Sequence, residues 1–184
     1  MVQVVVATPY PGAQRLLERY VGGCLKGIAS VRAVETDRVD AGACDILAVY
    51  DHSPNKKVFP RRFPGARVIG IRFVIQASGV RALAALPPGI TVGVVAAHRS
   101  CANQLLKQIL DSGIYEPRFV TGSFDDIPVT RVDKFAVAEE MEEPFWGAYS
   151  GDRSKVLVLP RSLCNSSVVE LINAASDVRA ARGE

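Results

Sequence analysis

The chain has 184 residues, of which 48% are apolar and 22% are charged. These proportions are typical of a globular protein and exclude a fibre or an extended disordered chain. The formal net charge of +3 is too small an excess to indicate a protein dedicated to binding polyanions. The length fits one large domain or two small lobes.

The beginning of the chain is a short apolar run without a basic segment before it, so we expect no secretion signal. No apolar run approaches the length of about 20 residues that a membrane-spanning helix needs. The cysteines are widely spaced and form no CxxC pair, which favours free thiols in a reducing compartment. Together these features predict a cytoplasmic protein that does not associate with membranes. The cysteines are Cys24, Cys44, Cys101 and Cys164.

Strand-like and helix-like segments alternate along the first part of the chain. Continuous β-branched runs are typical of strands buried on both faces, and apolar residues three or four apart indicate amphipathic helices. A Pro-, Lys- and Arg-rich segment predicts a loop. In order, we expect strand Val2–Ala7, helix Gly12–Leu25, strands Ser30–Glu35 and Asp45–Tyr50, the loop from Pro54 to Gly65, and strand Arg67–Val74.

The second part of the chain repeats this alternation. The strand, polar turn and helix at its start follow the same pattern as those at the beginning of the chain. Residues 139–153 have a mixed pattern and receive no assignment. In order, we expect helix Gln76–Leu86, strand Ile90–Ala97, helix Cys101–Asp111 capped by Ser100, strands Glu116–Thr121, Lys134–Ala138 and Lys155–Pro160, and helix Ser166–Arg179.

This alternation predicts an α/β protein with mostly parallel sheets. Because the pattern occurs twice, we interpret the chain as two small parallel-sheet lobes joined by a double-crossing hinge. The first lobe would contain residues 1–70 and 152–184, and the second would contain residues 71–151. Two lobes joined in this way enclose a cleft that can close on a ligand.

Two segments carry a resemblance to a known class of domain. Residues 66–114 (ARVIGIRFVIQASGVRALAALPPGITVGVVAAHRSCANQLLKQILDSGI) combine a crossing strand, a short helix, an LPPG turn and a VGVV strand. Residues 155–175 (KVLVLPRSLCNSSVVELINAA) provide a returning strand and a last helix. This layout resembles the two-lobed, type-2 periplasmic-binding-protein-like effector domains of GntR- and LysR-type bacterial transcriptional regulators. The resemblance implies a small-molecule-sensing domain that forms homodimers and that acts on DNA only through a segment absent from this chain.

Ligands of open α/β lobes bind beyond the carboxyl ends of the strands. Three arginines in such places favour an anionic or zwitterionic metabolite in the cleft between the lobes. Arg72, which interrupts an apolar strand, is expected to pair with an acid such as Asp51 or to face the ligand. Helix capping and solvation explain the Ser, Thr, Asn and His residues equally well. The candidate ligand-binding residues are Thr8, Tyr10, Arg72, His98, Arg99, Ser100, Thr121, Ser123, Arg161 and Asn165.

Enzyme motifs are missing from the sequence. It contains no GxSxG, GxxxxGK[ST], HExxH or GxGxxG pattern, so hydrolase, nucleotidase, zincin and dinucleotide-binding functions have no support. The two histidines, His52 and His98, lack the spacing of a metal site. We therefore expect no cofactor and no metal.

Two alternative functions stay open. Cys101 and Cys164 both open predicted helices, where a thiol loses its proton more easily, and the LCNSS segment faintly resembles cysteine-dependent amino-acid racemases. The third hypothesis is a protein–protein interaction module with a degenerate cleft. Phe63, Phe145 and Trp146, predicted in loops, would then form an apolar contact surface.

Overall fold

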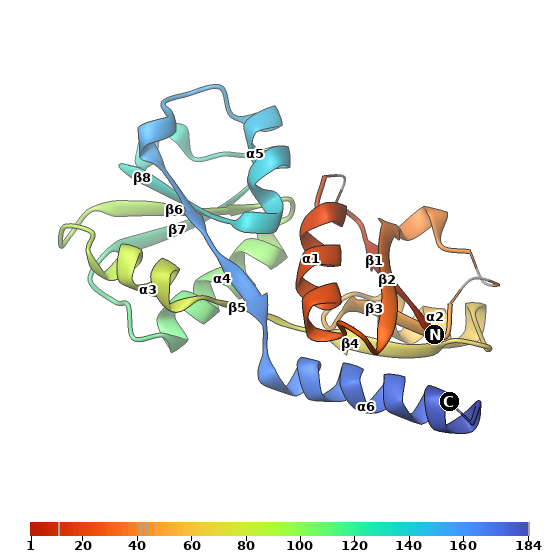
Figure 1. Cartoon of the computed structure of the whole chain (residues 1–184). Helices are drawn as coiled ribbons and strands as arrows, with labels where there is room; N and C mark the ends of the chain where they lie inside the picture. The colour runs from red at the N-terminus through yellow and green to blue at the C-terminus, as the bar shows by residue number, and fades with distance from the viewer. Residues whose placement is uncertain (11, 41, 43, 184) are drawn as a thin grey trace. The chain divides into compact units, whose positions relative to one another are not determined.

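The computed structural model describes residues 1–10, 12–40, 42 and 44–183, and the chain divides into two compact units. Unit 1 consists of residues 1–73 and 163–184, and unit 2 of residues 74–162. Each unit contains its own four-stranded parallel sheet, with helices between the strands (Figure 1). The predicted α/β class is confirmed. Among the described residues, no helix combines the length and the apolar character needed to cross a membrane.

The sheet of unit 1 has the strand order β2-β1-β3-β4. Its two central strands are buried along almost their whole length, as expected for β-branched runs covered on both faces. Helix α6 comes from the end of the chain and packs on β4 and β1. The elements of unit 1 are β1 (Val2–Thr8), α1 (Gln14–Cys24), β2 (Ala29–Glu35), β3 (Ile46–Tyr50), α2 (Asn55–Arg62), β4 (Arg67–Ile71) and α6 (Asn165–Ala181).

The sheet of unit 2 has the corresponding strand order, β7-β6-β8-β9. Helix α3, which precedes the sheet in the chain, packs on its edge strand β9. Residues 139–153, which the sequence left unassigned, contain the short helix α5. The elements of unit 2 are α3 (Ala77–Ala84), β6 (Thr91–Ala96), α4 (Arg99–Asp111), β7 (Arg118–Ser123), β8 (Lys134–Ala138), α5 (Glu142–Ala148) and β9 (Val156–Leu159).

The chain passes from unit 1 to unit 2 after Phe73 and returns after Ser162. Two short strands, β5 (Phe73–Ile75) and β10 (Arg161–Leu163), pair with each other at these crossings. The sequence predicted β9 in the first lobe, but the structure places it in unit 2 because it pairs in parallel with β8. The predicted boundary at residue 152 therefore moves to residue 162.

The two units repeat one framework in which corresponding residues lie 88 positions apart in the sequence. In both units, an aspartate carboxylate accepts a hydrogen bond from a backbone N–H at the start of a central strand. Asp45 accepts a hydrogen bond of 2.8 Å from the Gln3 N–H through its side chain, and its own N–H donates to the Gln3 carbonyl. Asp133 makes the same two bonds with Thr91, the side-chain bond again at 2.8 Å. The similarity of pattern noted in the sequence is therefore a similarity of structure.

The first repeat of the chain is residues 1–88 and the second begins at residue 89. The last helix of each repeat packs in the unit whose sheet is built from the other repeat. Helix α3 ends the first repeat and belongs to unit 2, whereas α6 ends the second repeat and belongs to unit 1. Equivalent backbone bonds fasten the two helix starts: the Cys164 N–H donates to the Arg72 carbonyl and the Gln76 N–H to the Pro160 carbonyl, both at 2.9 Å. The units are thus built from exchanged segments.

Helix α2 occupies the segment predicted as a basic loop. Pro60 lies inside the helix, which the sequence-based rule against internal prolines disfavours. Phe59 and Phe63 overcome this penalty, since both side chains are buried and pack edge-to-face with their ring centroids 5.1 Å apart. Burial of Phe63 and of Phe145 also corrects the hypothesis that these residues form an exposed apolar surface in loops.

Candidate functional site

The carboxyl ends of the four parallel strands of unit 1 lie at one edge of its sheet, which we call the carboxyl edge. Asp51 directly follows β3 and Arg72 directly follows β4, so both residues lie at this edge. Helix α6 begins there too, because the Cys164 N–H donates to the Arg72 carbonyl. A strand end, a neighbouring strand end and a helix start therefore meet in one place.

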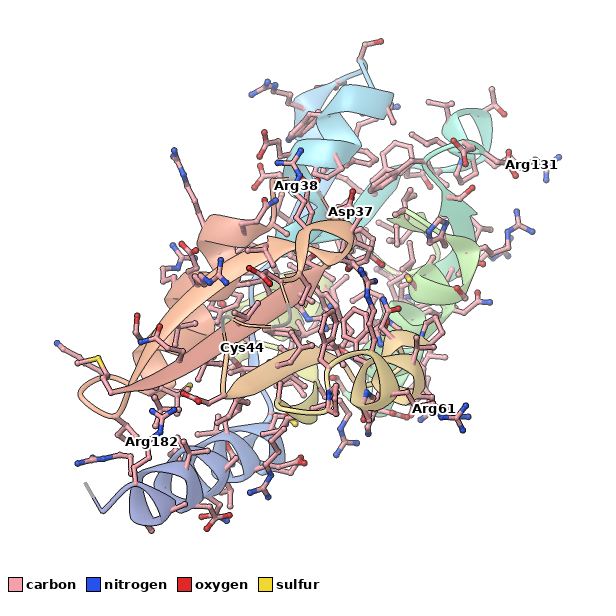
Figure 2. All side chains as sticks on the ribbon, turned by 90° about the vertical axis from the view of Figure 1, so that its right-hand side faces the viewer. Asp37, Arg38, Cys44, Arg61, Arg131 and Arg182 are labelled. Carbon is pink, nitrogen blue, oxygen red and sulfur yellow. The ribbon has the colours of Figure 1, made fainter. Side chains whose placement is uncertain are left out.

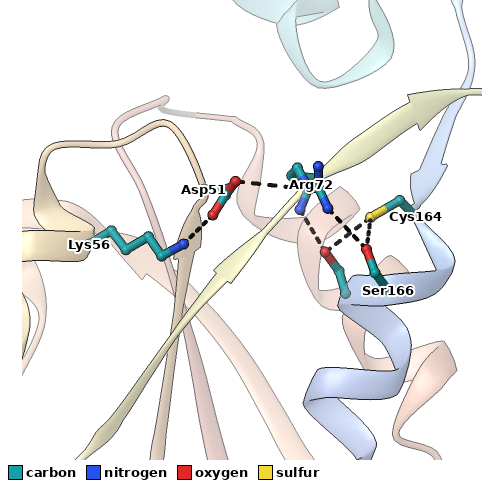
Figure 3. A network of polar contacts seen from close by, with 6 residues as sticks. Asp51, Lys56, Arg72, Cys164 and Ser166 are labelled. Atoms are coloured by element: carbon teal, nitrogen blue, oxygen red, sulfur yellow. Dashed lines mark hydrogen bonds and ion pairs between the residues drawn. The ribbon is translucent and has the colours of Figure 1, made fainter.

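Arg72 is fixed through its backbone while its guanidinium stays accessible (Figure 3). The Arg72 N–H donates to Ser167 Oγ at 2.9 Å, and Nη2 donates to Ser166 Oγ at 3.2 Å. The side chain is 62% exposed. The sequence predicted an acidic partner or a ligand for this arginine. The structure confirms Asp51 as the acidic partner, with Nε 3.9 Å from Oδ2.

A second cation completes the group around Asp51. Lys56, from the first turn of α2, donates a short hydrogen bond to Asp51 Oδ1. This hydrogen bond, supported by the charges of Lys56 and Arg72, lowers the pKa of the Asp51 carboxyl although partial burial acts in the opposite direction. Asp51 is therefore ionised at neutral pH. The group contains two cations and one anion.

Cys164 is the N-cap residue of α6 and lies beside Arg72. Partial burial by itself would raise the pKa of the thiol. Hydrogen bonds to Ser166 and Ser167, with Oγ–Sγ distances of 3.2 Å, and the charge of Arg72 outweigh that effect and lower the pKa. The thiol is thus more acidic than an ordinary cysteine.

Aromatic side chains form the interior next to Arg72. Tyr50, at the end of β3, contacts both Tyr10 and Phe73, with ring centroids 5.8 Å and 5.7 Å away. All three side chains are buried. His52 contacts Tyr50 from the exposed side, at a centroid distance of 5.6 Å. The strand end that carries Asp51 is therefore next to a buried aromatic cluster.

The equivalent junction of unit 2 keeps the counterparts of Ser166 and Asp51, which are Ser78 and Glu139, but it lacks the arginine. Arg72 corresponds there to Pro160, and Ser167 corresponds to Gly79. A Cβ atom at Gly79 would lie 3.3 Å from Pro160 Cδ, so a serine does not fit without movement of its neighbours. The shared framework therefore closes the same junction without an arginine at the strand end and without a serine at the position of Ser167.

The predicted site residues divide between the units. Thr8, Tyr10, Arg72 and Asn165 lie in unit 1, and the other six lie in unit 2. The Thr8 side chain is fully buried, and its hydroxyl accepts a hydrogen bond from the Tyr10 N–H at 3.1 Å. Thr8 also lines a small pocket of about 280 Å³ with Glu35 and Asp37, whereas Asn165 is exposed on the first turn of α6.

Among the unit 2 candidates, Arg161 has a structural role and Ser100 lacks the one predicted for it. Arg161 is buried and pairs with buried Glu140, with 3.3 Å between Nη1 and Oε1, and its N–H donates to Glu139 Oε2. Ser100 is not the helix cap, because α4 begins at Arg99 and His98 occupies the N-cap position. His98 and Ser100 are both exposed.

Sequence reasoning missed Lys56, Ser166 and Ser167. The two serines were assigned to the opening of the last helix, and nothing in the sequence shows that this helix packs against the strand that ends at Arg72. Lys56 was placed in a loop because Pro60 obscured helix α2. A search for positions 88 residues apart could have found the Arg72–Pro160 contrast from the sequence.

Comparisons with protein-family models, with curated proteins and with solved structures find no match. The class of protein that the fold defines is an α/β protein with two parallel-sheet units of equal strand order and exchanged helices. The candidate site within it consists of the charged side chains of Asp51, Lys56 and Arg72 and the hydroxyl of Ser166 at the carboxyl edge of unit 1.

Proposed function

We propose that the protein is a ligand-binding module that takes a small anionic or zwitterionic metabolite at the carboxyl edge of unit 1. Arg72 and the Ser166 hydroxyl bind the carboxylate or phosphate of the ligand. When the ligand also carries an ammonium group, the Asp51 carboxylate attracts it. No covalent chemistry is needed for this function.

The contrast between the two units carries this proposal. Both units make a bond from a helix start to the residue after the edge strand, and in unit 2 the Gln76 N–H donates to the Pro160 carbonyl. Unit 1 places an exposed arginine at the point where unit 2 has Pro160. Because the shared framework does not need an arginine at this point, its presence at an exposed strand end favours recognition of a charged molecule.

The geometry suits an anion held from two directions. Guanidinium groups form paired hydrogen bonds with carboxylates and phosphates, and Ser166 Oγ lies 3.2 Å from Nη2, so both groups reach one oxyanion. The N-terminus of the 17-residue helix α6 adds favourable electrostatics. The contacts of Arg72 with Ser166 and Asp51 orient the guanidinium and pre-organise the site.

A thermal-shift screen of amino acids, small organic acids and sugar phosphates tests the proposal. We expect at least one compound to raise the melting temperature, and Arg72→Ala to weaken its binding roughly tenfold to a hundredfold, the range for a lost charge-assisted hydrogen bond. Isothermal titration calorimetry of the hit measures the change. Backbone contacts of residue 72 do not involve the side chain, so the variant keeps the junction with α6.

Arg67→Ala is the matched control. Arg67 begins the same strand at the opposite edge of the sheet, and its side chain is similarly exposed, at 49%. Loss of one positive charge there leaves binding unchanged if the site is local. Equal weakening by both variants, or no stabilising compound in the whole panel, contradicts the proposed function.

The resemblance to effector domains of transcriptional regulators extends the proposal to a biological role. In that role, the bound metabolite changes the stability of unit 1, and the change passes to a DNA-binding segment or to a second copy of the chain. A reporter gene under control of the full-length regulator tests this step. Its response to the metabolite should disappear with Arg72→Ala and persist with Arg67→Ala.

One observation favours the racemase-like alternative, namely the lowered pKa of the Cys164 thiol. A racemase needs a second cysteine, and the other candidate, Cys101, lies in the first turn of α4 in unit 2. Conversion of L-glutamate or L-aspartate to the D-enantiomer, abolished by both Cys101→Ser and Cys164→Ser, would establish this activity. Absence of turnover would contradict this alternative.

A further inference from the structure

Unit 2 has a pocket of its own at the carboxyl end of β7. Its volume is about 400 Å³, and Arg99, Thr121, Asp126, Thr130 and Arg131 supply its polar lining. Small-molecule sites commonly have volumes of about 300–1,000 Å³. The pocket is therefore large enough for a phosphorylated metabolite rather than an inorganic ion alone.

The loop that forms one wall of the pocket is firmly attached to the sheet. Its Phe124 N–H donates to the Ala96 carbonyl at 3.1 Å, and its Asp126 N–H donates to the Ser123 carbonyl at 3.0 Å. The loop also lies directly against Gly122, where a Cβ atom would be only 2.7 Å from Pro128 Cδ. This close approach, which glycine permits, fixes the loop against the sheet and so defines the wall of the pocket.

The charged side chains of the pocket are exposed, and the ion pair between two of them is weak. Arg99 Nη2 lies 3.1 Å from Asp126 Oδ2, but the two side chains are 63% and 76% exposed. Solvent-exposed pairs of this kind contribute little to stability, so an anion can replace Asp126 at the guanidinium. Arg131, labelled in Figure 2, is exposed and provides a second guanidinium at the same pocket.

We propose that this pocket is a separate binding site for an organic phosphate. Two guanidinium groups and two threonine hydroxyls offer more donors than a planar carboxylate can accept, whereas a phosphate monoester has three terminal oxygens to receive them. Val120 and Pro128 line the pocket beside these donors and contact the organic part of the ligand. The proposal stands independently of the site in unit 1.

Phenyl phosphate is the probe, with benzoate as its carboxylate counterpart and inorganic phosphate as the anion without the ring. Titration into the ¹⁵N-labelled full chain, followed by NMR, should shift the amide signals of residues 120–131, and phenyl phosphate should bind at least tenfold more tightly than either comparison compound. Arg99→Ala and Arg131→Ala should each weaken it roughly tenfold or more. Tighter binding of benzoate would overturn the assignment to phosphate.

Two variants distinguish this site from its surroundings. Arg118→Ala removes an exposed arginine from the opposite end of β7 and should leave phenyl phosphate binding unchanged. Arg72→Ala tests the unit 1 site separately and should also have no effect here. The proposal fails if Arg118→Ala weakens binding as much as Arg99→Ala does, or if phenyl phosphate shifts no signal between residues 120 and 131.

Discussion

At the scale of single residues, the molecule contains ion pairs of two kinds. The Arg161 and Glu140 side chains are only 9% and 4% exposed, so each charge depends on the other for compensation. The Arg67 and Asp177 side chains are 49% and 67% exposed and are solvated by water. Removal of one partner of a buried pair leaves an uncompensated charge in a medium of low dielectric constant, whereas removal of an exposed partner does not.

We therefore expect Glu140→Gln to destabilise the protein by about 3–5 kcal/mol. Asp177→Asn, the control in the exposed pair, should cost less than about 1 kcal/mol. Urea unfolding followed by circular dichroism measures both free energies. Similar values for the two variants would show that the buried pair is not electrostatically important.

The acidity of Cys164 gives a second test at this scale. Because its pKa is lowered, alkylation by iodoacetamide should reach half its maximal rate at a lower pH than alkylation of Cys24 or Cys44, whose thiol pKa values are raised by burial. Ser166→Ala removes a hydrogen bond to the thiolate and should move the Cys164 midpoint to higher pH. Peptide mass spectrometry after timed alkylation follows each cysteine separately. Identical midpoints for all three cysteines would contradict this account.

At the scale of elements, local sequence pattern predicted most strands and few of their partners. The run Lys134–Ala138 was predicted with its observed bounds, since a short apolar run between polar residues is a local signal. The predicted strand Arg67–Val74 is instead two strands, because Arg72 turns toward the start of α6. The fourfold contact of Arg72, Asp51, Cys164 and Ser166 joins residues up to 115 positions apart, which no local pattern reveals.

Because α3 and α6 are exchanged, we expect substitutions of two equivalent leucines to destabilise different units. Leu171 in α6 and Leu83 in α3 are both almost fully buried, so replacement by alanine should cost about 2–5 kcal/mol in each case. Leu171→Ala should lower hydrogen-exchange protection first in β1 and β4 of unit 1, and Leu83→Ala first in β9 of unit 2. Loss of protection in the unit that precedes each helix in the chain would contradict the exchange.

At the scale of the whole molecule, the repeated framework explains why sequence reasoning found two lobes but misplaced their boundary. The similarity of the two rounds is visible because the buried strands Val2–Thr8 and Thr91–Ala96 carry the same kind of residues. The predicted lobes already placed helix Gln76–Leu86 in the second lobe and helix Ser166–Arg179 in the first, which is where the structure has α3 and α6. Only the pairing of β9 with β8 decides to which sheet it belongs.

Exchange also predicts how the protein behaves when it is cut between its repeats. Pro87, Pro88 and Gly89 are exposed and join α3 to β6, so a protease site inserted there separates residues 1–88 from the remainder. Each fragment then contributes segments to both units. The two fragments should therefore stay associated after cleavage, elute together in size-exclusion chromatography and keep the far-UV circular dichroism of the intact chain. Fragments that separate without denaturant would show that α3 and α6 do not hold the units together.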